Sequence, residues 1–165
     1  MAVTLVLGGT RSGKSEVAER MAAGLGDVVT YVATAAVDPT DADHARRVEA
    51  HRARRPAAWP TVEVGADLPT VLASIEGPVI VDSLGTWVAA CDFEVDELAL
   101  RSALTTREGS TIVVSEEVGL GVHPPTELGV RFQDALGRLN RVVADIADDV
   151  WLVIAGRALG LGDPP

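Results

Sequence analysis

The residues with the clearest chemical use are eight consecutive positions with the spacing G-x-x-x-x-G-K-[ST], namely Gly8, Gly9, Thr10, Arg11, Ser12, Gly13, Lys14 and Ser15. In this pattern the backbone N–H groups of a glycine-rich loop surround phosphates, the lysine reaches the β- and γ-phosphates, and the serine hydroxyl ligates Mg²⁺. Lys14 is the only lysine of the chain, and the other thirteen of its 14 strongly basic residues are arginines. A lysine retained at this one position favours a task that needs a compact ammonium group. The pattern therefore predicts a nucleoside triphosphate site with Mg²⁺, and the alternative is a glycine-rich turn in which Gly-Lys-Ser occurs by chance.

Acidic residues follow two of the later apolar runs. Asp82 ends the run 79–82, where a nucleotide-binding sheet commonly places the carboxylate that holds Mg²⁺ directly or through water. An aspartate that begins a turn after a strand is the alternative interpretation of Asp82. Glu116 and Glu117 follow the run 111–115, and because neighbouring residues of an extended chain face opposite ways, at most one of the two is expected to face a site.

The segment 41–56 contains two of the three histidines and a series of arginines. Arg47 and Arg55 lie four residues on either side of His51, so they favour a neutral imidazole and attract phosphate. A nucleophilic histidine that attacks a phosphoryl group needs both conditions. The acids of the segment stand at its start and its bases at its end, however, and the helix dipole alone explains that arrangement. The residues leave both interpretations open. We expect His44 to be a surface residue and His123, beside Pro124, to be mostly structural.

Short β-rich apolar runs alternate with helical stretches along the chain. The expected strands are 3–7, 28–33, 79–82, 111–115 and 150–154, and the expected helices are 15–25, 41–54, 68–75, 95–105 and a last one from 126 or 132 to 147. This alternation predicts a P-loop NTPase-like α/β fold with a mainly parallel sheet of five or more strands and helices on both faces. Ligands of such sheets gather at the carboxyl ends of the strands. We expect a single nucleotide-binding domain over 1–165, with a frayed tail at 160–165.

Composition excludes several classes of function. The net charge of −10 and the pI near 4.6 argue against non-specific binding to nucleic acids or anionic lipids. No apolar run reaches the roughly 18 residues of a membrane span, and no signal-type sequence precedes the first strand, so we expect a cytoplasmic protein. The single cysteine, Cys91, fits a reducing compartment, and we expect it to serve in packing.

Five motifs in one order resemble the adenosylcobinamide kinase/adenosylcobinamide-phosphate guanylyltransferase family of vitamin B12 synthesis. They are the loop 8–15, Tyr31-Val32-Ala33-Thr34-Ala35, the run from His51-Arg52 through Arg55-Pro56 to Trp59-Pro60-Thr61-Val62-Glu63, Val81-Asp82-Ser83-Leu84, and Glu117-Val118-Gly119-Leu120-Gly121-Val122-His123-Pro124. The resemblance covers Val3 to Gly156. Many enzymes share the phosphate loop, whereas the run from His51 through Glu63 is far more specific to this family.

The resemblance implies a bifunctional enzyme. ATP or GTP would first phosphorylate adenosylcobinamide, and GTP would then give GMP to that phosphate through a guanylylated histidine, with release of pyrophosphate. Carried over by position, His51 is the guanylylated residue, Lys14 acts with it in catalysis, and Ser15 and Asp82 hold Mg²⁺. The remaining nucleotide contacts would be Gly8 through Ser15, Ala33, Thr34, Ala35, Arg52, Ala53, Arg54, Arg55, Glu63 and Asp82. The resemblance also implies a homotrimer.

Two other functions stay open from the sequence. A single-function small-molecule kinase would need Lys14, Ser15 and Asp82 but not His51. A non-enzymatic switch would bind GTP, change conformation and contact a protein partner. Because only a neutral imidazole can attack phosphorus, guanylylation through His51 should decline as the pH falls below the pKa of that histidine.

Overall fold

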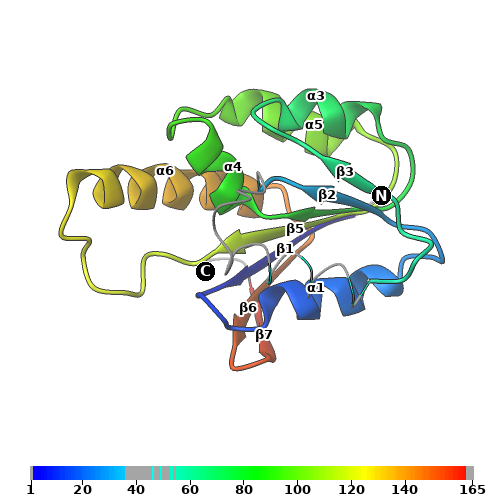
Figure 1. The fold of residues 1–165 in the computed structure, drawn as a ribbon, viewed down its shortest axis with the longest axis horizontal. Coiled ribbons are helices and arrows are strands. Elements are labelled where there is room, and N and C mark those ends of the chain that lie inside the picture. Colours follow the sequence, from blue (N-terminus) through cyan, green and yellow to red (C-terminus); the bar gives the residue numbers. More distant parts are fainter. Residues whose placement is uncertain (1, 36–45, 47–48, 50–52, 54, 163–165) are drawn as a thin grey trace.

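The computed structural model describes residues 2–35, 46, 49, 53 and 55–162. Its strands form one seven-stranded sheet in the order β3-β2-β4-β5-β1-β6-β7, in which only β7 is antiparallel to its neighbour (Figure 1). The strands are β1 (Val3–Gly8), β2 (Thr30–Ala33), β3 (Thr61–Glu63), β4 (Val79–Asp82), β5 (Thr111–Glu116), β6 (Asp149–Ile154) and β7 (Arg157–Leu161). The five expected strands and the mainly parallel α/β sheet are confirmed, and β3 and β7 add to them.

Helices cover both faces of the sheet. In Figure 1, α3 (Leu68–Ser74), α4 (Leu84–Ala90), α5 (Glu97–Thr106) and α6 (Glu127–Ala144) lie above the sheet, and α1 (Lys14–Ala23) lies below it. The strands bury side chains in both directions, since Val79 and Val81 pack among residues of α3 to α6 whereas Ile80 between them packs against α1. Continuous apolar strands of this kind are typical of a parallel sheet that is covered on both faces.

The register of the strands brings the ends of five of them to one edge. Gly8 of β1 pairs with Glu116 of β5, and Ala33 of β2 pairs with both Asp82 of β4 and Glu63 of β3. These are the carboxyl ends of parallel strands, where α/β sheets bind ligands. The fold therefore places the loop 8–15 and Asp82 at the same edge.

The helix α4 was not among the helices expected from the sequence, in which a turn beginning at Asp82 was an alternative interpretation. Ser83 caps this helix, and a capping box joins its side chain and that of Thr86 to each other's backbone. The helix contains Gly85, a poor helix former, and is only seven residues long. Its formation depends on packing, because Leu84, Trp87 and Val88 are all buried in the core on that face.

The end of the chain also differs from the expectation. A frayed tail was predicted at 160–165, but β7 continues to Leu161 and pairs along its whole length with β6. The other expected helices are found to within a few residues, except that 41–54 lies mostly outside the described residues; Arg46, Glu49 and Ala53, which are described, are helical. Within the described part of the chain, no helix combines the length and the apolar character needed to cross a membrane.

Candidate functional site

The loop between β1 and α1 has the backbone shape that its glycines allow. Gly13 precedes α1 with a φ of 89°, in the left-handed region that favours glycine. A Cβ atom at Gly8 would collide with the Ser12 hydroxyl and would lie 2.8 Å from the Val153 carbonyl oxygen. The Ser12 carbonyl also accepts a hydrogen bond of 2.7 Å from the Gly156 amide. These contacts hold the loop tightly against the end of β6.

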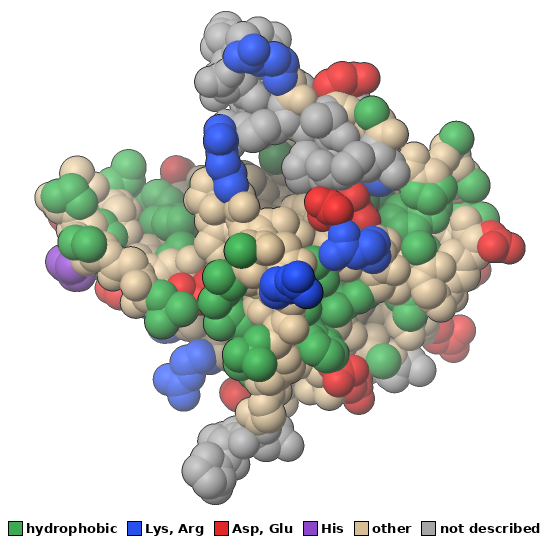
Figure 2. All heavy atoms as spheres, turned by 90° about the horizontal axis from the view of Figure 1, so that it is seen from below, with side chains coloured by type: hydrophobic (Ala, Val, Ile, Leu, Met, Phe, Trp, Pro, Cys, Tyr) green, Lys and Arg blue, Asp and Glu red, His purple; other side chains and the backbone are tan. Residues whose placement is uncertain are grey.

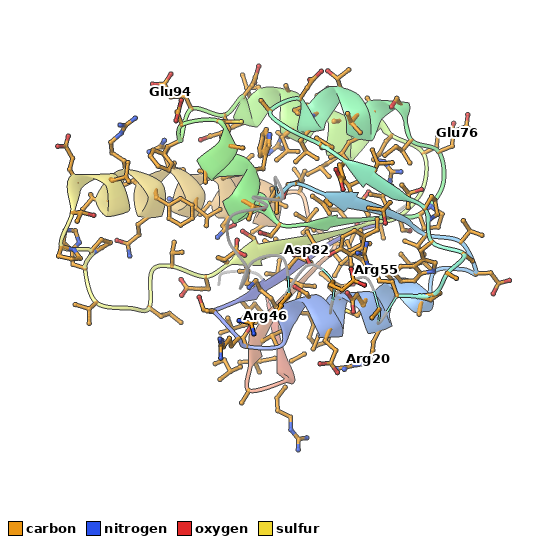
Figure 3. The ribbon with its side chains drawn as sticks, viewed as in Figure 1. Arg20, Arg46, Arg55, Glu76, Asp82 and Glu94 are labelled. Carbon is orange, nitrogen blue, oxygen red and sulfur yellow. The ribbon has the colours of Figure 1, made fainter. Side chains whose placement is uncertain are left out.

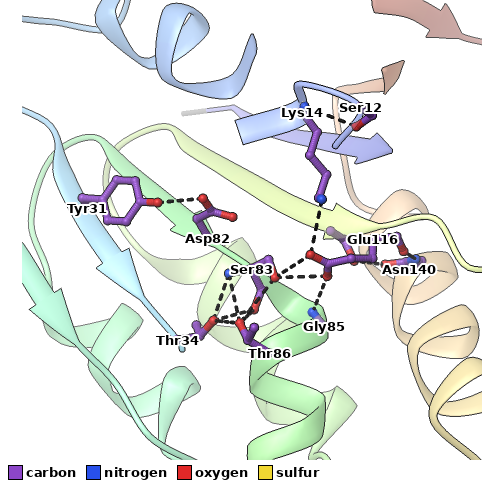
Figure 4. Close-up of polar contacts among 11 residues, drawn as sticks. Ser12, Lys14, Tyr31, Thr34, Asp82, Ser83, Gly85, Thr86, Glu116 and Asn140 are labelled. Atoms are coloured by element: carbon purple, nitrogen blue, oxygen red, sulfur yellow. Dashed lines mark hydrogen bonds and ion pairs between the residues drawn. The ribbon is translucent and has the colours of Figure 1, made fainter. Parts of the chain in front are cut away.

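Lys14 points from this loop toward β5. Its Nζ lies 3.5 Å from Oε1 of Glu116, and the two side chains are only 12% and 26% exposed (Figure 4). The Glu116 carboxylate also accepts hydrogen bonds from the Ser83 hydroxyl at 2.9 and 3.0 Å and from the Gly85 amide at 3.0 Å. One carboxylate therefore joins the phosphate loop to the first turn of α4. Sequence reasoning left the role of Glu116 open, because nothing in the local pattern shows which cation it meets.

Glu117 faces elsewhere. Its carboxylate accepts hydrogen bonds from the backbone amides of Gly119, at 2.7 Å, and Leu120, at 3.0 Å, so it stabilises the turn that follows β5. The expectation that at most one residue of the acidic pair faces the site agrees with this geometry. His123 lies exposed in the same loop before α6.

Thr34, directly after β2, is buried at the same edge. Its hydroxyl donates to the Ser83 carbonyl oxygen at 2.6 Å and accepts from the Ser83 amide at 2.9 Å. It also lies 2.5 Å from the hydroxyl of Thr86 on α4. This position was predicted as a nucleotide contact, and in the structure its side chain is occupied in joining β2 to the start of α4.

Asp82 contacts an unexpected partner. The hydroxyl of Tyr31 donates a hydrogen bond of 2.6 Å to Oδ2 of Asp82, and the guanidinium of Arg55 stacks on the Tyr31 ring with Cζ 3.7 Å from the ring centroid. Figure 3 shows Asp82 and Arg55 close to each other beside the sheet, on the side of α1. Burial chiefly, and the Asp82 charge next, raise the pKa of Tyr31 far above its ordinary value, so its hydroxyl stays protonated and remains the donor.

Most of the predicted site residues that the structure describes thus lie at one edge of the sheet. The loop from Gly8 to Ser15, the stretch from Ala33 to Ala35, Glu63 and Asp82 gather at the carboxyl edge of the sheet, with Arg55 above Tyr31. Ala53 is exposed, and His51, Arg52 and Arg54 lie outside the described residues. Sequence reasoning gave no role to Tyr31 or Ser83 and left that of Glu116 open; the position of Glu116 at the end of an apolar run was the signal that made it a candidate.

The donor atoms at this edge fit a hard cation such as Mg²⁺. Ser15 offers a hydroxyl and Asp82 a carboxylate, both of them oxygen donors. Over 2–35 and 55–162, together with the three isolated described positions, no group of three or more histidine, cysteine, aspartate or glutamate side chains forms a metal cage. Mg²⁺ usually takes one or two protein oxygen ligands and completes its shell with phosphate oxygens and water, so a hydroxyl and a carboxylate are donors of the type that it uses.

Charged side chains are mixed over the outer surface. Figure 2 shows basic side chains interspersed with acidic and apolar ones on the face that it presents. Among the described residues, the ion pairs of Arg20 with Glu16 at 2.8 Å and of Arg138 with Glu97 at 3.6 Å are surface contacts. Such pairs contribute little to stability and mark no site.

Solved structures share this fold at low sequence identity. An ATPase of the type III secretion system of pathogenic bacteria aligns with a TM-score of 0.58 and 12% identity over 96% of this chain and 56% of its own. The ATPase EscN of enteropathogenic Escherichia coli aligns with a TM-score of 0.56 and 13% identity over 93% of this chain and 43% of its own. These structural similarities confirm the P-loop NTPase-like fold, and at this sequence identity they show the fold alone.

Sequence comparisons are more specific. The bifunctional adenosylcobalamin biosynthesis protein CobP of Pseudomonas aeruginosa is 39% identical over 98% of both chains. The proteins named CobU of Salmonella typhimurium and Escherichia coli K12 are 32% and 34% identical, each over 92% of this chain and 95% of their own. The model of the cobinamide kinase/cobinamide phosphate guanyltransferase family matches residues 4–161. With a match of that extent, and with its phosphate loop, Asp82 and Glu116 at one sheet edge, the chain belongs to the cobinamide kinase/cobinamide phosphate guanyltransferase family.

Proposed function

We propose that this protein phosphorylates adenosylcobinamide with ATP or GTP and then transfers GMP from GTP to adenosylcobinamide phosphate. The products of the second reaction are adenosylcobinamide-GDP and pyrophosphate. Family membership over 4–161 and relatives named as bifunctional adenosylcobalamin biosynthesis proteins support this function. The observation on which it most depends is the Lys14 ammonium, held at the first residue of α1, directly after the glycine-rich loop, where it can meet a triphosphate.

The described residues divide the work of binding the triphosphate. Backbone N–H groups of the loop from Gly8 to Ser15 surround the phosphates, and Lys14 exchanges its contact with Glu116 for one with phosphate oxygens. Ser15 and Asp82 would hold Mg²⁺, which supplies neutralisation of phosphate charge when it is bound. Positive charge at this point stabilises the transferred group in both reactions.

The second reaction requires a nucleophile, and we assign that role to His51 on its sequence context. A neutral imidazole nitrogen attacks the α-phosphorus of GTP, a nitrogen–phosphorus bond forms, and the bond to the leaving pyrophosphate breaks. A phosphate oxygen of adenosylcobinamide phosphate then attacks the same phosphorus, which releases the imidazole. Two easier displacements replace one difficult transfer.

Labelling with α-³²P-GTP and Mg²⁺ tests this proposal. We expect a protein-bound label that acid releases and alkali does not, as for phosphorus bonded to an imidazole nitrogen. His51→Ala should remain unlabelled, whereas the matched control His44→Ala should be labelled like the wild type. Phosphorylation of adenosylcobinamide should continue in His51→Ala within about threefold, because that step does not use the imidazole. A label that persists in His51→Ala, or full guanylyl transfer by that variant, would contradict the assignment.

Oligomeric state and location are part of the same proposal. The family resemblance supports a homotrimer, and the single cysteine supports a location in the reducing cytoplasm. Sedimentation equilibrium at micromolar protein checks the oligomeric state directly, since a trimer has three times the 17.2 kDa mass of the chain.

A further inference from the structure

Tyr31 is the only tyrosine of the chain, and both its hydroxyl and its ring contact charged side chains. The residue lies on β2 and is 4% exposed. Its hydroxyl donates the 2.6 Å hydrogen bond to Asp82, one strand away, and its ring carries the Arg55 guanidinium (Figures 3 and 4). One side chain therefore contacts a carboxylate and a cation that come from different parts of the chain.

The strand register explains how Tyr31 reaches Asp82. Tyr31 pairs with Ile80 on β4, and Asp82 stands two positions further along that strand, on the same face as Ile80. A diagonal neighbour on the same face of a sheet is within reach of an aromatic side chain. The hydrogen bond ties Oδ2 of Asp82 to the side chain of Tyr31 and so restricts the orientation of the carboxylate.

Side chains of β2 and β3 hold Arg55. Its guanidinium donates a 3.1 Å hydrogen bond to the Thr61 hydroxyl on β3, and Thr61 is the register partner of Tyr31. A guanidinium stacked on an aromatic ring is held in its plane while its N–H groups remain directed outward from the ring edge. Arginine held in this way is suited to contact a phosphate.

We infer that Tyr31 is a positioning residue of the nucleotide site: its hydroxyl orients Asp82 toward the magnesium-bound triphosphate, and its ring holds Arg55 toward a phosphate of the same nucleotide. This inference rests on the proposed function for the identity of the ligand. The groups that face Tyr31 electrostatically are Asp82 on β4, Arg55, and Glu19 on α1. The phenol hydroxyl is a hydrogen-bond donor, and the geometry directs it at Oδ2 of Asp82.

Two substitutions at Tyr31 separate its two roles, the orientation of Asp82 by the hydroxyl and the support of Arg55 by the ring. Tyr31→Phe deletes one oxygen atom and keeps the ring, so the Mg²⁺ concentration that half-saturates binding of a non-hydrolysable GTP analogue should rise about three- to tenfold. Affinity for the analogue at saturating Mg²⁺ should stay within about twofold. Tyr31→Leu also removes the surface under Arg55, so affinity should fall a further tenfold or so even at saturating Mg²⁺. Arg55→Met should reproduce only this second loss.

A control variant and a spectroscopic readout distinguish positioning from simple packing. Val29→Ala truncates a buried neighbour in the same core cluster and should lower stability without changing the Mg²⁺ dependence. Tyrosine labelled with ¹³C at Cζ gives one signal, because the chain has one tyrosine. That signal should shift when Mg²⁺ and the analogue are added to the wild type, and the Mg²⁺-dependent part of the shift should vanish in Asp82→Asn.

The outcomes are decisive in either direction. Equal Mg²⁺ dependence in the wild type and Tyr31→Phe, or an equal change in Val29→Ala and Tyr31→Phe, overturns the inference. A ¹³C signal that does not respond to Mg²⁺ with the analogue also overturns it. These measurements use binding alone. A protein that binds the analogue but transfers no guanylyl group would therefore contradict the proposed function without contradicting the inference about Tyr31.

Discussion

At the scale of single residues, the contact between Lys14 and Glu116 is the most informative. The lysine that the phosphate loop uses for its ligand is held, in the protein alone, by an internal carboxylate 3.5 Å away. Glu116 is itself fixed by Ser83 and Gly85, so it stays in place when Lys14 turns to a phosphate. A triphosphate must therefore compete with Glu116 for the ammonium, and it must also approach a negative charge.

Glu116→Gln should tighten triphosphate binding. The amide retains an acceptor oxygen for the Gly85 amide but removes the competing charge, and a partly exposed ion pair is worth up to about 1 kcal/mol. We therefore expect the dissociation constant for a non-hydrolysable analogue, measured by calorimetry, to fall by up to about fivefold. Glu117→Gln should leave it unchanged, because the Glu117 carboxylate accepts only from its own turn in the contacts described above. Weaker binding in Glu116→Gln would show that the carboxylate assists the ligand.

At the scale of elements, Arg107 holds together the edge of the sheet opposite the site. It is 4% exposed at the end of α5, and its guanidinium donates to carbonyl oxygens of Leu72, Ile75, Gly77 and Gly109 and, at 2.6 Å, to the Thr111 hydroxyl. One side chain thus joins the end of α3, the turn before β4 and the start of β5. Burial lowers the pKa of Arg107, because desolvation disfavours its charged form.

Arg107→Met should destabilise the fold without touching the site. The thioether replaces the volume but leaves several buried carbonyl oxygens without donors, which should lower the free energy of unfolding by about 3 kcal/mol in urea titrations. Arg101→Met, at an exposed position of the same helix, should change it by less than about 0.5 kcal/mol. If the two variants unfold at the same urea concentration, Arg107 does not join these elements.

At the scale of the whole molecule, two apolar cores lie on opposite faces of one sheet. Tyr31 belongs to the core under α1, with Val17, Ile80 and Val114, while the other core joins the strands to α3, α4, α5 and α6. Because the phenol is buried in this core beside Asp82, its ionisation is coupled to global unfolding.

Stability should consequently fall at alkaline pH. The unfolded chain releases the Tyr31 proton near pH 10, whereas the folded chain keeps it because burial and Asp82 raise its pKa. Above pH 10 the unfolded state therefore binds fewer protons, and the free energy of unfolding loses about 1.4 kcal/mol per pH unit from this group. Urea unfolding between pH 9 and 11.5 should show this slope in the wild type and a slope smaller by that amount in Tyr31→Phe. Parallel curves for the two proteins would rule out the coupling.

Short-range patterns in the sequence were sufficient for much of this architecture. Five strands, most helices and the loop from Gly8 to Ser15 follow from apolar periodicity and from glycine spacing within a few residues. Asp82 was identifiable because a carboxylate at the end of a parallel strand necessarily lies at the ligand edge. The role of His51 stays a prediction, since that residue lies outside the described part of the chain.

Other features were decided only by the tertiary structure. All five residues of β7 are exposed, so no alternation of apolar and polar residues marks that strand. Gly85 within α4 is explained by Glu116, whose carboxylate occupies the space that a Cβ atom would take. The partners Lys14 with Glu116, and Tyr31 with Asp82, are about 100 and 51 residues apart in sequence. Local sequence sets which groups stand at the ends of strands, but strand order and register determine which of those groups meet, because hydrogen bonds and ion pairs act only over a few ångströms.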